Sequence, residues 1–293
     1  MDPKALFERF GRRPEPSACL KSALEDLERL VPPRPDLARP AEALARVLTA
    51  AFLHPDPTVV PPATLEAMAD ARSAGLVAFQ AVSPVLDRGL LNGRGRALAE
   101  VLGGDNPRGL ELAAAIRGRR VDLARWAGEV LAGRPESVEA GAAEAKVEPT
   151  LAASVLRFSL LPTLARVSEA LEAHRPGMPA DRGDCPHCGS RPLLAESRGL
   201  EQRIVFRCGL CASAWPGERL SCPSCGESGA KALHYSFIEG EQERFRLAHC
   251  DTCRYDWKVV STLTPLSPPS LIVADLASVH LDVLAADPAR QTP

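Results

Sequence analysis

Cys185-Pro186-His187-Cys188 begins the stretch of sequence that decides the fold, and three further Cys-x-x-Cys pairs follow it before residue 254. These pairs are Cys208-Gly209-Leu210-Cys211, Cys222-Pro223-Ser224-Cys225 and Cys250-Asp251-Thr252-Cys253. Eight of the nine cysteines lie in this segment. A Cys-x-x-Cys pair on a tight turn directs two thiolates at one cation, and two such turns complete a tetrahedral shell of four sulfurs. Such a shell suits Zn²⁺ or a single iron ion, so the sequence predicts two four-cysteine metal sites.

The spacing between the pairs indicates which of them share a cation. Nineteen residues separate the first pair from the second and twenty-four separate the third from the fourth, but only ten separate the second from the third. Two Cys-x-x-Cys pairs about 15–20 residues apart are typical of a metal site. We therefore predict two consecutive sites, and an interleaved pairing remains the alternative. The predicted ligands are Cys185, Cys188, Cys208 and Cys211 for the first site, and Cys222, Cys225, Cys250 and Cys253 for the second.

The turns themselves repeat. The first and third pairs share the plan Cys-Pro-x-Cys-Gly, in which proline fixes φ after the first cysteine and Gly189 or Gly226 permits a left-handed residue after the second. The second and fourth pairs lack the proline. Each predicted site thus combines a proline-containing turn with a plainer one, and this internal repeat supports the consecutive pairing.

Disulfides and a redox-active dithiol are the competing interpretations of the cysteines. The segment Met1-Asp2-Pro3-Lys4-Ala5 does not resemble a secretory signal, and clustered cysteines in a cytoplasmic chain more often bind metal. A thioredoxin-like dithiol needs a βαβ pattern, which we do not find. Spacing does not separate zinc from iron, although zinc is the commoner occupant. The ninth cysteine, Cys19, is expected to be a small buried residue without a role.

Composition and charge narrow the function classes. The 293 residues are 45% apolar with a net charge of −2, and we find no run of about 18 apolar residues, so we expect a globular protein without a membrane span. Residues 181–260 contain eleven Lys/Arg and eleven Asp/Glu, which disfavours nucleic acid as a partner. Arg198, Arg203 and Arg207 could form a local basic patch, but we expect them to screen the thiolate charge.

The N-terminal part, residues 1–180, is rich in alanine, leucine and arginine and is predicted to be an all-α domain. Leu160, Leu164, Val167 and Leu171 recur at helical spacing and form one apolar stripe. Glycines and prolines in residues 177–184 indicate a linker. The candidate helices are 19–31, 41–53, 64–74, 76–90, 107–117, 120–132 and 148–173.

The composition changes after the linker. Short alternating runs flank the cysteine pairs and predict strands, and Trp215, Tyr235, Tyr255 and Trp257 are expected to form small cores. The predicted fold is multi-domain α+β: the helical domain precedes two consecutive rubredoxin-like or zinc-ribbon β modules and a short C-terminal helix. The boundaries are 1–180 for the helical domain, 181–217 and 218–262 for the two modules, and 263–293 for the helix and a tail.

The ordered set of motifs resembles the FdhE family of formate dehydrogenase accessory proteins. The resemblance runs from the first cysteine pair to the C-terminal segment, and the helical part agrees only in being helical. The motifs are Cys185-Pro186-His187-Cys188-Gly189-Ser190-Arg191-Pro192, Cys208-Gly209-Leu210-Cys211, Trp215 with Arg219 and Cys222, Cys250-Asp251-Thr252-Cys253-Arg254-Tyr255 with Lys258, and Asp275-Leu276-Ala277-Ser278.

The resemblance implies a cytoplasmic maturation factor that is not an enzyme and that binds the catalytic subunit of a respiratory formate dehydrogenase. It also implies two iron ions in rubredoxin-like sites, each held by four cysteines, with zinc as the alternative. No nucleic acid and no membrane span are expected, and a homodimer is left open. The alternative functions are a nucleic-acid-binding zinc ribbon and a rubredoxin-like electron-transfer protein.

Overall fold

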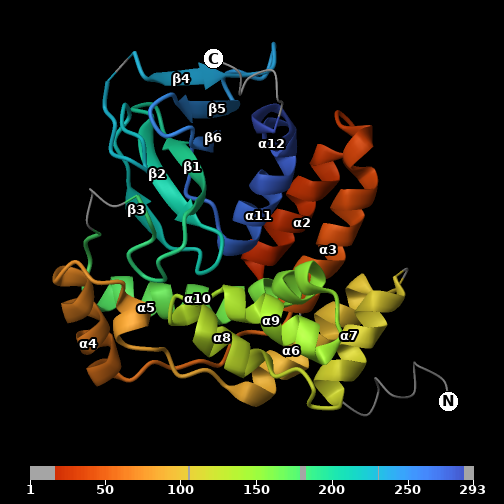
Figure 1. Ribbon diagram of the computed structural model, residues 1–293. Coiled ribbons are helices and arrows are strands. Elements are labelled where there is room, and N and C mark those ends of the chain that lie inside the picture. The colour runs from red at the N-terminus through yellow and green to blue at the C-terminus, as the bar shows by residue number, and fades with distance from the viewer. Residues whose placement is uncertain (1–16, 105, 179–182, 230, 287–293) are drawn as a thin grey trace.

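In the protein, a β-sheet lies against a layer of helices (Figure 1). The computed structural model describes residues 17–104, 106–178, 183–229 and 231–286. N-terminal helices precede a sheet that contains both groups of cysteines, which confirms the predicted fold class. The predicted boundary at residues 180 and 181 and the predicted tail at 287–293 lie outside the described residues.

The helices begin where side chains satisfy free backbone N–H groups. Ser17, Asp87, Asn106, Asp122 and Glu148 each accept a hydrogen bond from the first turn of the helix that follows. The helical segments are α2 (Ala18–Leu30), η1 (Pro35–Leu37), α3 (Ala38–Phe52), α4 (Pro62–Ser73), α5 (Ala78–Ala81), α6 (Arg88–Leu102), α7 (Pro107–Arg117), α8 (Leu123–Leu131), α9 (Glu136–Ala145) and α10 (Pro149–His174).

Helix α10 is the centre of the helical half. The predicted stripe of Leu160, Leu164, Val167 and Leu171 is fully buried, and Pro162 lies inside the helix. By length and composition α10 could cross a membrane, and 61% of its most apolar window is buried inside the protein. Its side chains form the largest hydrophobic cluster together with those of the neighbouring helices and of the sheet half, as in the core helix of a globular domain.

Two parts of the helical prediction differ from the structure. The helix expected at 76–90 is wrong: only the single turn α5 forms, and a new helix starts at Arg88 after the cap Asp87. Helix α6 continues through Gly93 and Gly95, which lower helix propensity and hid it from the pattern. Helix α9 was not predicted, because its ten residues include four alanines and one glycine and show no clear apolar periodicity.

The strands form one six-stranded sheet in the order β3-β2-β1-β6-β5-β4. Strands β1 to β3 are antiparallel neighbours, as are β4 to β6, so each predicted module contributes three strands. Strands β1 and β6 pair in parallel, with Ala195 opposite Val259, and this pairing joins the modules into one sheet. The strands are β1 (Pro192–Arg198), β2 (Arg203–Cys208), β3 (Ala214–Pro216), β4 (Leu233–Ser236), β5 (Phe245–Cys250) and β6 (Asp256–Thr262).

The C-terminal segment forms two helices rather than one. Helices α11 (Pro268–Ala277) and α12 (Val279–Ala285) meet at Ser278 with a bend of 52°. Taken as one segment, this bent pair is also long and apolar enough to cross a membrane. Helix α11 packs on α2 and α12 packs on β5, so the pair fills the space between the sheet and the helical half (Figure 1). Lys258 of β6 reaches both helices, with Nζ 2.5 Å from the carboxylate of Asp275 and 2.8 Å from that of Asp282.

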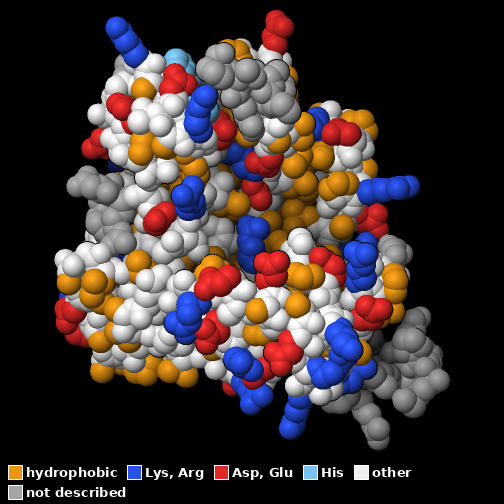
Figure 2. All heavy atoms as spheres, in the orientation of Figure 1, with side chains coloured by type: hydrophobic (Ala, Val, Ile, Leu, Met, Phe, Trp, Pro, Cys, Tyr) orange, Lys and Arg blue, Asp and Glu red, His pale blue; other side chains and the backbone are white. Residues whose placement is uncertain are grey.

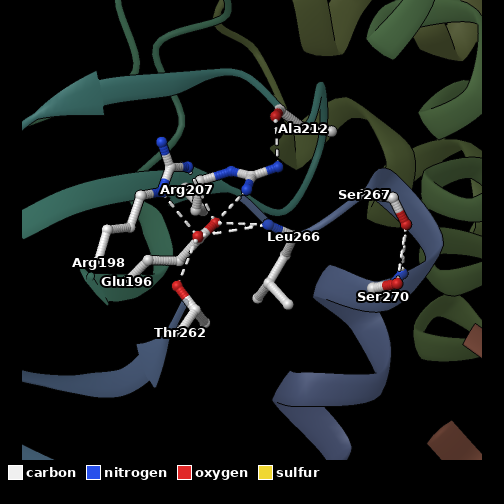
Figure 3. A network of polar contacts seen from close by, with 8 residues as sticks. All are labelled: Glu196, Arg198, Arg207, Ala212, Thr262, Leu266, Ser267 and Ser270. Carbon is white, nitrogen blue, oxygen red and sulfur yellow. Dashed lines mark hydrogen bonds and ion pairs between the residues drawn. The ribbon is translucent and has the colours of Figure 1, made fainter. Parts of the chain in front are cut away.

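A buried carboxylate ties three strands to this C-terminal segment (Figure 3). Glu196 of β1 is fully buried and accepts hydrogen bonds from Arg198, from Arg207 and from Thr262 of β6. The backbone N–H of Leu266 also lies 3.3 Å from Glu196 Oε2. Burial acts to raise the pKa of Glu196, but the two arginines outweigh it and its pKa lies below the usual value.

These contacts correct the role expected for the arginines. Arg198 and Arg207 compensate Glu196, and Arg203 pairs with Glu201 at the surface. The principal partners of these three arginines are therefore carboxylates and not the thiols, and Arg207 is buried rather than part of a basic patch.

Candidate metal centres

The first group of thiols lies between the sheet and the helical half. The Sγ atoms of Cys185 and Cys211 are 3.5 Å apart, and those of Cys188 and Cys208 are 3.3 Å apart. The four Sγ atoms all lie within 4.8 Å of one another, and each residue is buried. We call this group the first cluster. It has the membership that the consecutive pairing predicts.

The second cluster consists of Cys222, Cys225, Cys250 and Cys253. Its Sγ atoms are 3.5 Å apart between Cys222 and Cys253 and 3.7 Å apart between Cys225 and Cys250. Cys222 and Cys250 are buried, whereas Cys225 is exposed and Cys253 is partly exposed. The structure thus separates the eight thiols into two consecutive groups, and the interleaved pairing does not occur.

The spacing of the sulfurs fits a bound cation. A tetrahedral centre with metal–sulfur bonds of about 2.3 Å has sulfur–sulfur edges of about 3.8 Å. The separations of 3.3 to 3.7 Å approach that edge and exceed the length of about 2.05 Å of a disulfide. All nine cysteines are free, so the disulfide interpretation is wrong for this structure. Each cluster can therefore supply the complete ligand shell of a thiophilic ion such as iron or zinc.

The four Cys-x-x-Cys turns, which we call knuckles, share one backbone conformation. In each, the residue after the second cysteine is left-handed, with φ of 78° at Gly189, 57° at Ala212, 75° at Gly226 and 60° at Arg254. The N–H of that same residue donates to the carbonyl of the first cysteine, at distances between 2.8 and 3.1 Å. In the sequence, only the glycines at two of these positions indicated a left-handed residue. Alanine and arginine adopt the same conformation at a cost that the rest of the turn offsets.

Backbone N–H groups point at the sulfurs. Those of Cys188 and Cys211 lie 3.5 Å from Sγ of Cys185 and of Cys208, and that of Ser224 lies 3.4 Å from Sγ of Cys222. A hydrogen bond to sulfur stabilises the thiolate over the thiol and so lowers the cost of gathering four negative sulfurs.

Without a cation, four neighbouring thiols cannot all ionise, and their pKa values separate. Burial raises the pKa of Cys222 to about 12. Burial also acts to raise the pKa of Cys253, but the backbone N–H of Tyr255 and the neighbouring thiols outweigh it and bring its pKa to about 7. A cation must therefore displace a proton from Cys222, so binding at the second cluster should strengthen as the pH rises.

His187, inside the first knuckle, is a residue whose position the sequence did not reveal. It is fully buried, with Nδ1 3.0 Å from Ser168 Oγ and Nε2 3.2 Å from an Arg72 nitrogen. Because a guanidinium only donates, Nε2 must accept, and the ring proton lies on Nδ1 and is donated to Ser168. His187 therefore holds the knuckle against α4 and α10 and does not serve as a metal ligand.

The aromatic residues and Cys19 agree only partly with the prediction. Trp215 and Trp257 are buried in the sheet half as expected. Tyr235 is 37% exposed, and Tyr255 is partly buried, with the guanidinium of Arg191 5.1 Å above its ring. Cys19 was expected to be buried, but it is exposed, because it lies on the outer face of α2 while Leu20 and Ala23 point inward.

The fold and the two clusters define a class of protein: a helical domain joined to one sheet that carries two four-cysteine sites. No family model matches the chain. The crystal structure of the FdhE protein from Pseudomonas aeruginosa has a similar fold, with a TM-score of 0.61 over 93% of this chain and 92% of that chain at 23% identity.

Curated relatives match over shorter segments. The chain is 35% identical over 130 residues to the FdhE homolog of Rhizobium meliloti (strain 1021), which covers 42% of this chain and 40% of that protein. It is 33% identical over 102 residues to protein FdhE of Escherichia coli (strain K12), which covers 33% of this chain and 31% of that protein. The chain thus spans less than half the length of these relatives. The sequence matches are therefore to FdhE proteins, the family that the motifs resemble, and the crystal structure shows the shared fold.

Proposed function

We propose that this protein is an accessory factor for the assembly of a respiratory formate dehydrogenase and that it binds the catalytic subunit of that enzyme in the cytoplasm. The observation that carries the proposal is the pair of four-thiol clusters in a fold like that of an FdhE protein. The clusters would hold two iron ions, with zinc as the alternative, and all eight thiols would serve as ligands. The sheet half would contribute to the docking surface.

The geometry favours a binding role over catalysis. Four sulfurs complete a tetrahedral shell, so a cation in either cluster would have no open position at which to activate water or a substrate. We therefore propose that the protein is not an enzyme. A thiolate shell can still support a one-electron change if the ion is iron.

Charge also argues against the nucleic-acid alternative. On the face shown in Figure 2, acidic and basic side chains are interspersed rather than gathered by sign. Arg207 of β2 is buried against Glu196. A protein that binds nucleic acid through phosphates usually presents a basic face. A mobility-shift experiment at low salt tests this directly, and we expect no shift.

Electron transfer is the second candidate function, and the exposure of Cys225 favours it, because a partly open cluster allows close approach of a redox partner. The visible spectrum of the purified protein is decisive for this alternative. A colourless protein without iron excludes it.

The test of the proposed function is capture of the formate dehydrogenase catalytic subunit by the tagged protein, together with formate-dependent dye reduction in cells. We expect Cys185→Ala and Cys222→Ala to abolish dye reduction, whereas Cys19→Ala, outside both clusters, leaves it unchanged. Full dye reduction in both cluster variants would contradict the proposal. Light scattering on the same sample determines whether the protein is a homodimer.

A further inference from the structure

The two clusters differ in their access to solvent. All four cysteines of the first cluster are buried, with at most 4% of any residue exposed. In the second cluster Cys225 is exposed and Cys253 is partly exposed. The two sites have the same ligands and the same turn geometry, so solvent access and surroundings are what distinguish them.

Both knuckles of the first cluster are held by the helical half. The N–H groups of Ala78 and Phe79, in α5, donate to the carbonyls of Pro186 and His187 at 3.0 and 2.8 Å. The guanidinium of Arg157, in α10, donates to the carbonyl of Gly209 at 3.0 Å. Figure 1 shows that these helices lie directly beneath the lower end of the sheet. Opening the first cluster therefore requires breaking contacts between the two halves of the protein.

The knuckles of the second cluster are held within the sheet half. Asp251 N–H donates to the carbonyl of Ala232, and Thr252 Oγ1 donates to Glu227 at 3.1 Å. The Glu227 carbonyl in turn accepts from Cys222 N–H at 2.8 Å. These partners lie on surface turns, so local opening around Cys225 leaves the junction with the helices intact.

We propose that the clusters divide their tasks: the first fixes the sheet to the helical domain, and the second exchanges its metal with competing thiol ligands that approach at Cys225. With an ion bound, an incoming thiolate would first take the place of Cys225 Sγ, and three further thiolates would replace those of Cys222, Cys250 and Cys253 before the ion leaves. One thiolate replaces another, so the charge of the centre is unchanged and no electron is transferred. The inference rests on the metal-binding part of the proposed function.

Metal release from the full-length protein tests the proposal. The protein is loaded with two zinc ions, excess dithiothreitol is added as the competing thiol, and native mass spectrometry counts the ions per chain over time. Timed iodoacetamide labelling identifies the cysteines that have lost their ion. We expect one ion to leave at least about tenfold faster than the other, because local opening costs less than separation of the halves. Cys19 is exposed and holds no ion, so it should be labelled from the start; among the eight cluster cysteines, the first labelled residues should be those of the second cluster.

Two variants distinguish metal release from the first cluster from release at the second. Arg157→Ala removes the hydrogen bond to Gly209, and we expect the slow release to accelerate by about tenfold, the effect of one charge-assisted hydrogen bond, while the fast release is unchanged. Arg166→Ala, at an exposed position on the same helix, is the matched control and should change neither rate.

Each other outcome has a definite meaning. Two ions that leave at equal rates, or early labelling of Cys185 and Cys188, overturn the division of tasks and leave the proposed function standing. A protein that binds no metal at either cluster overturns both.

Discussion

Asp56 illustrates how a single residue stabilises the helical half without belonging to any motif. Its side chain is 4% exposed and lies 2.9 Å from a guanidinium nitrogen of Arg94, which is also buried. Thr163 Oγ1 and the backbone N–H of Thr58 donate to the same carboxylate. Burial acts to raise the pKa of Asp56, but the bonds from Thr163, Thr58 and Arg94 outweigh it, so its pKa lies below the ordinary value of 3.8.

This pair gives a pH-dependent prediction. Asp56→Asn leaves Arg94 buried without its counter-charge, and we expect a loss of about 3–5 kcal/mol in the free energy of unfolding near neutral pH. Because the folded pKa is depressed, the contribution of Asp56 is complete above the unfolded pKa and disappears as the pH falls through the folded pKa. The unfolding free energies of wild type and variant, measured with urea, should therefore begin to converge below about pH 4 and become equal below the folded pKa of Asp56.

An exposed pair is the control for that experiment. Asp26, 43% exposed, pairs with Arg29 on α2, and Asp26→Asn should change stability by less than about 1 kcal/mol. A difference between Asp56→Asn and wild type that persists unchanged into acid would contradict the assigned role of Asp56.

At the scale of elements, α6 owes its position to a glycine. A Cβ on Gly95 would lie 2.0 Å from Leu123 Cδ1 and 3.1 Å from Ser159 Oγ, so the absence of a side chain lets α6 approach α8 and α10 closely. Gly93, two residues earlier, has no atom within 4 Å of the corresponding position. The sequence showed two similar glycines, and only their tertiary contacts distinguish them.

This difference predicts opposite effects of the same substitution. Gly95→Ala should destabilise the protein by about 1–3 kcal/mol, because the packed neighbours must move. Gly93→Ala should stabilise it by about 0.5–1 kcal/mol through helix propensity alone. Thermal unfolding followed by circular dichroism measures both. Equal shifts in the same direction would mean that α6 does not approach its neighbours as described.

At the scale of the whole molecule, the features formed by residues close in sequence could be predicted, and the contacts between segments far apart in the chain could not. The four knuckles and the membership of each cluster follow from short patterns between Cys185 and Cys253, and most of the helices follow from local periodicity in residues 19–173. The parallel pairing of β1 with β6 and the contacts of His187 with Arg72 join segments far apart in the chain. Periodicity describes which face of a strand is buried but not which strand lies beside it, so these features could not be predicted.

Metal removal should unfold the sheet half and leave most of the helical half folded. With both ions extracted by a strong chelator at neutral pH, we expect the near-ultraviolet circular dichroism from the buried Trp215 and Trp257 to collapse. The helical signal should largely remain, because most of the buried residues in the cluster around α10 belong to the helices. Return of zinc or iron should restore the spectrum. A metal-free protein with unchanged spectra and melting temperature would show that the clusters do not stabilise the sheet half.

The parallel pairing of Ala195 with Val259 also has a consequence for how the chain folds while it is still being synthesised on the ribosome. The first module can gather its four cysteines as soon as Cys211 has emerged, yet one edge of β1 has no partner until β6 has been translated. During that interval the nascent chain exposes an unpaired strand edge, which is prone to mispairing and aggregation. Ribosomes stalled between the second and third cysteine pairs should therefore carry an aggregation-prone chain, and chains extended past Thr262 should not.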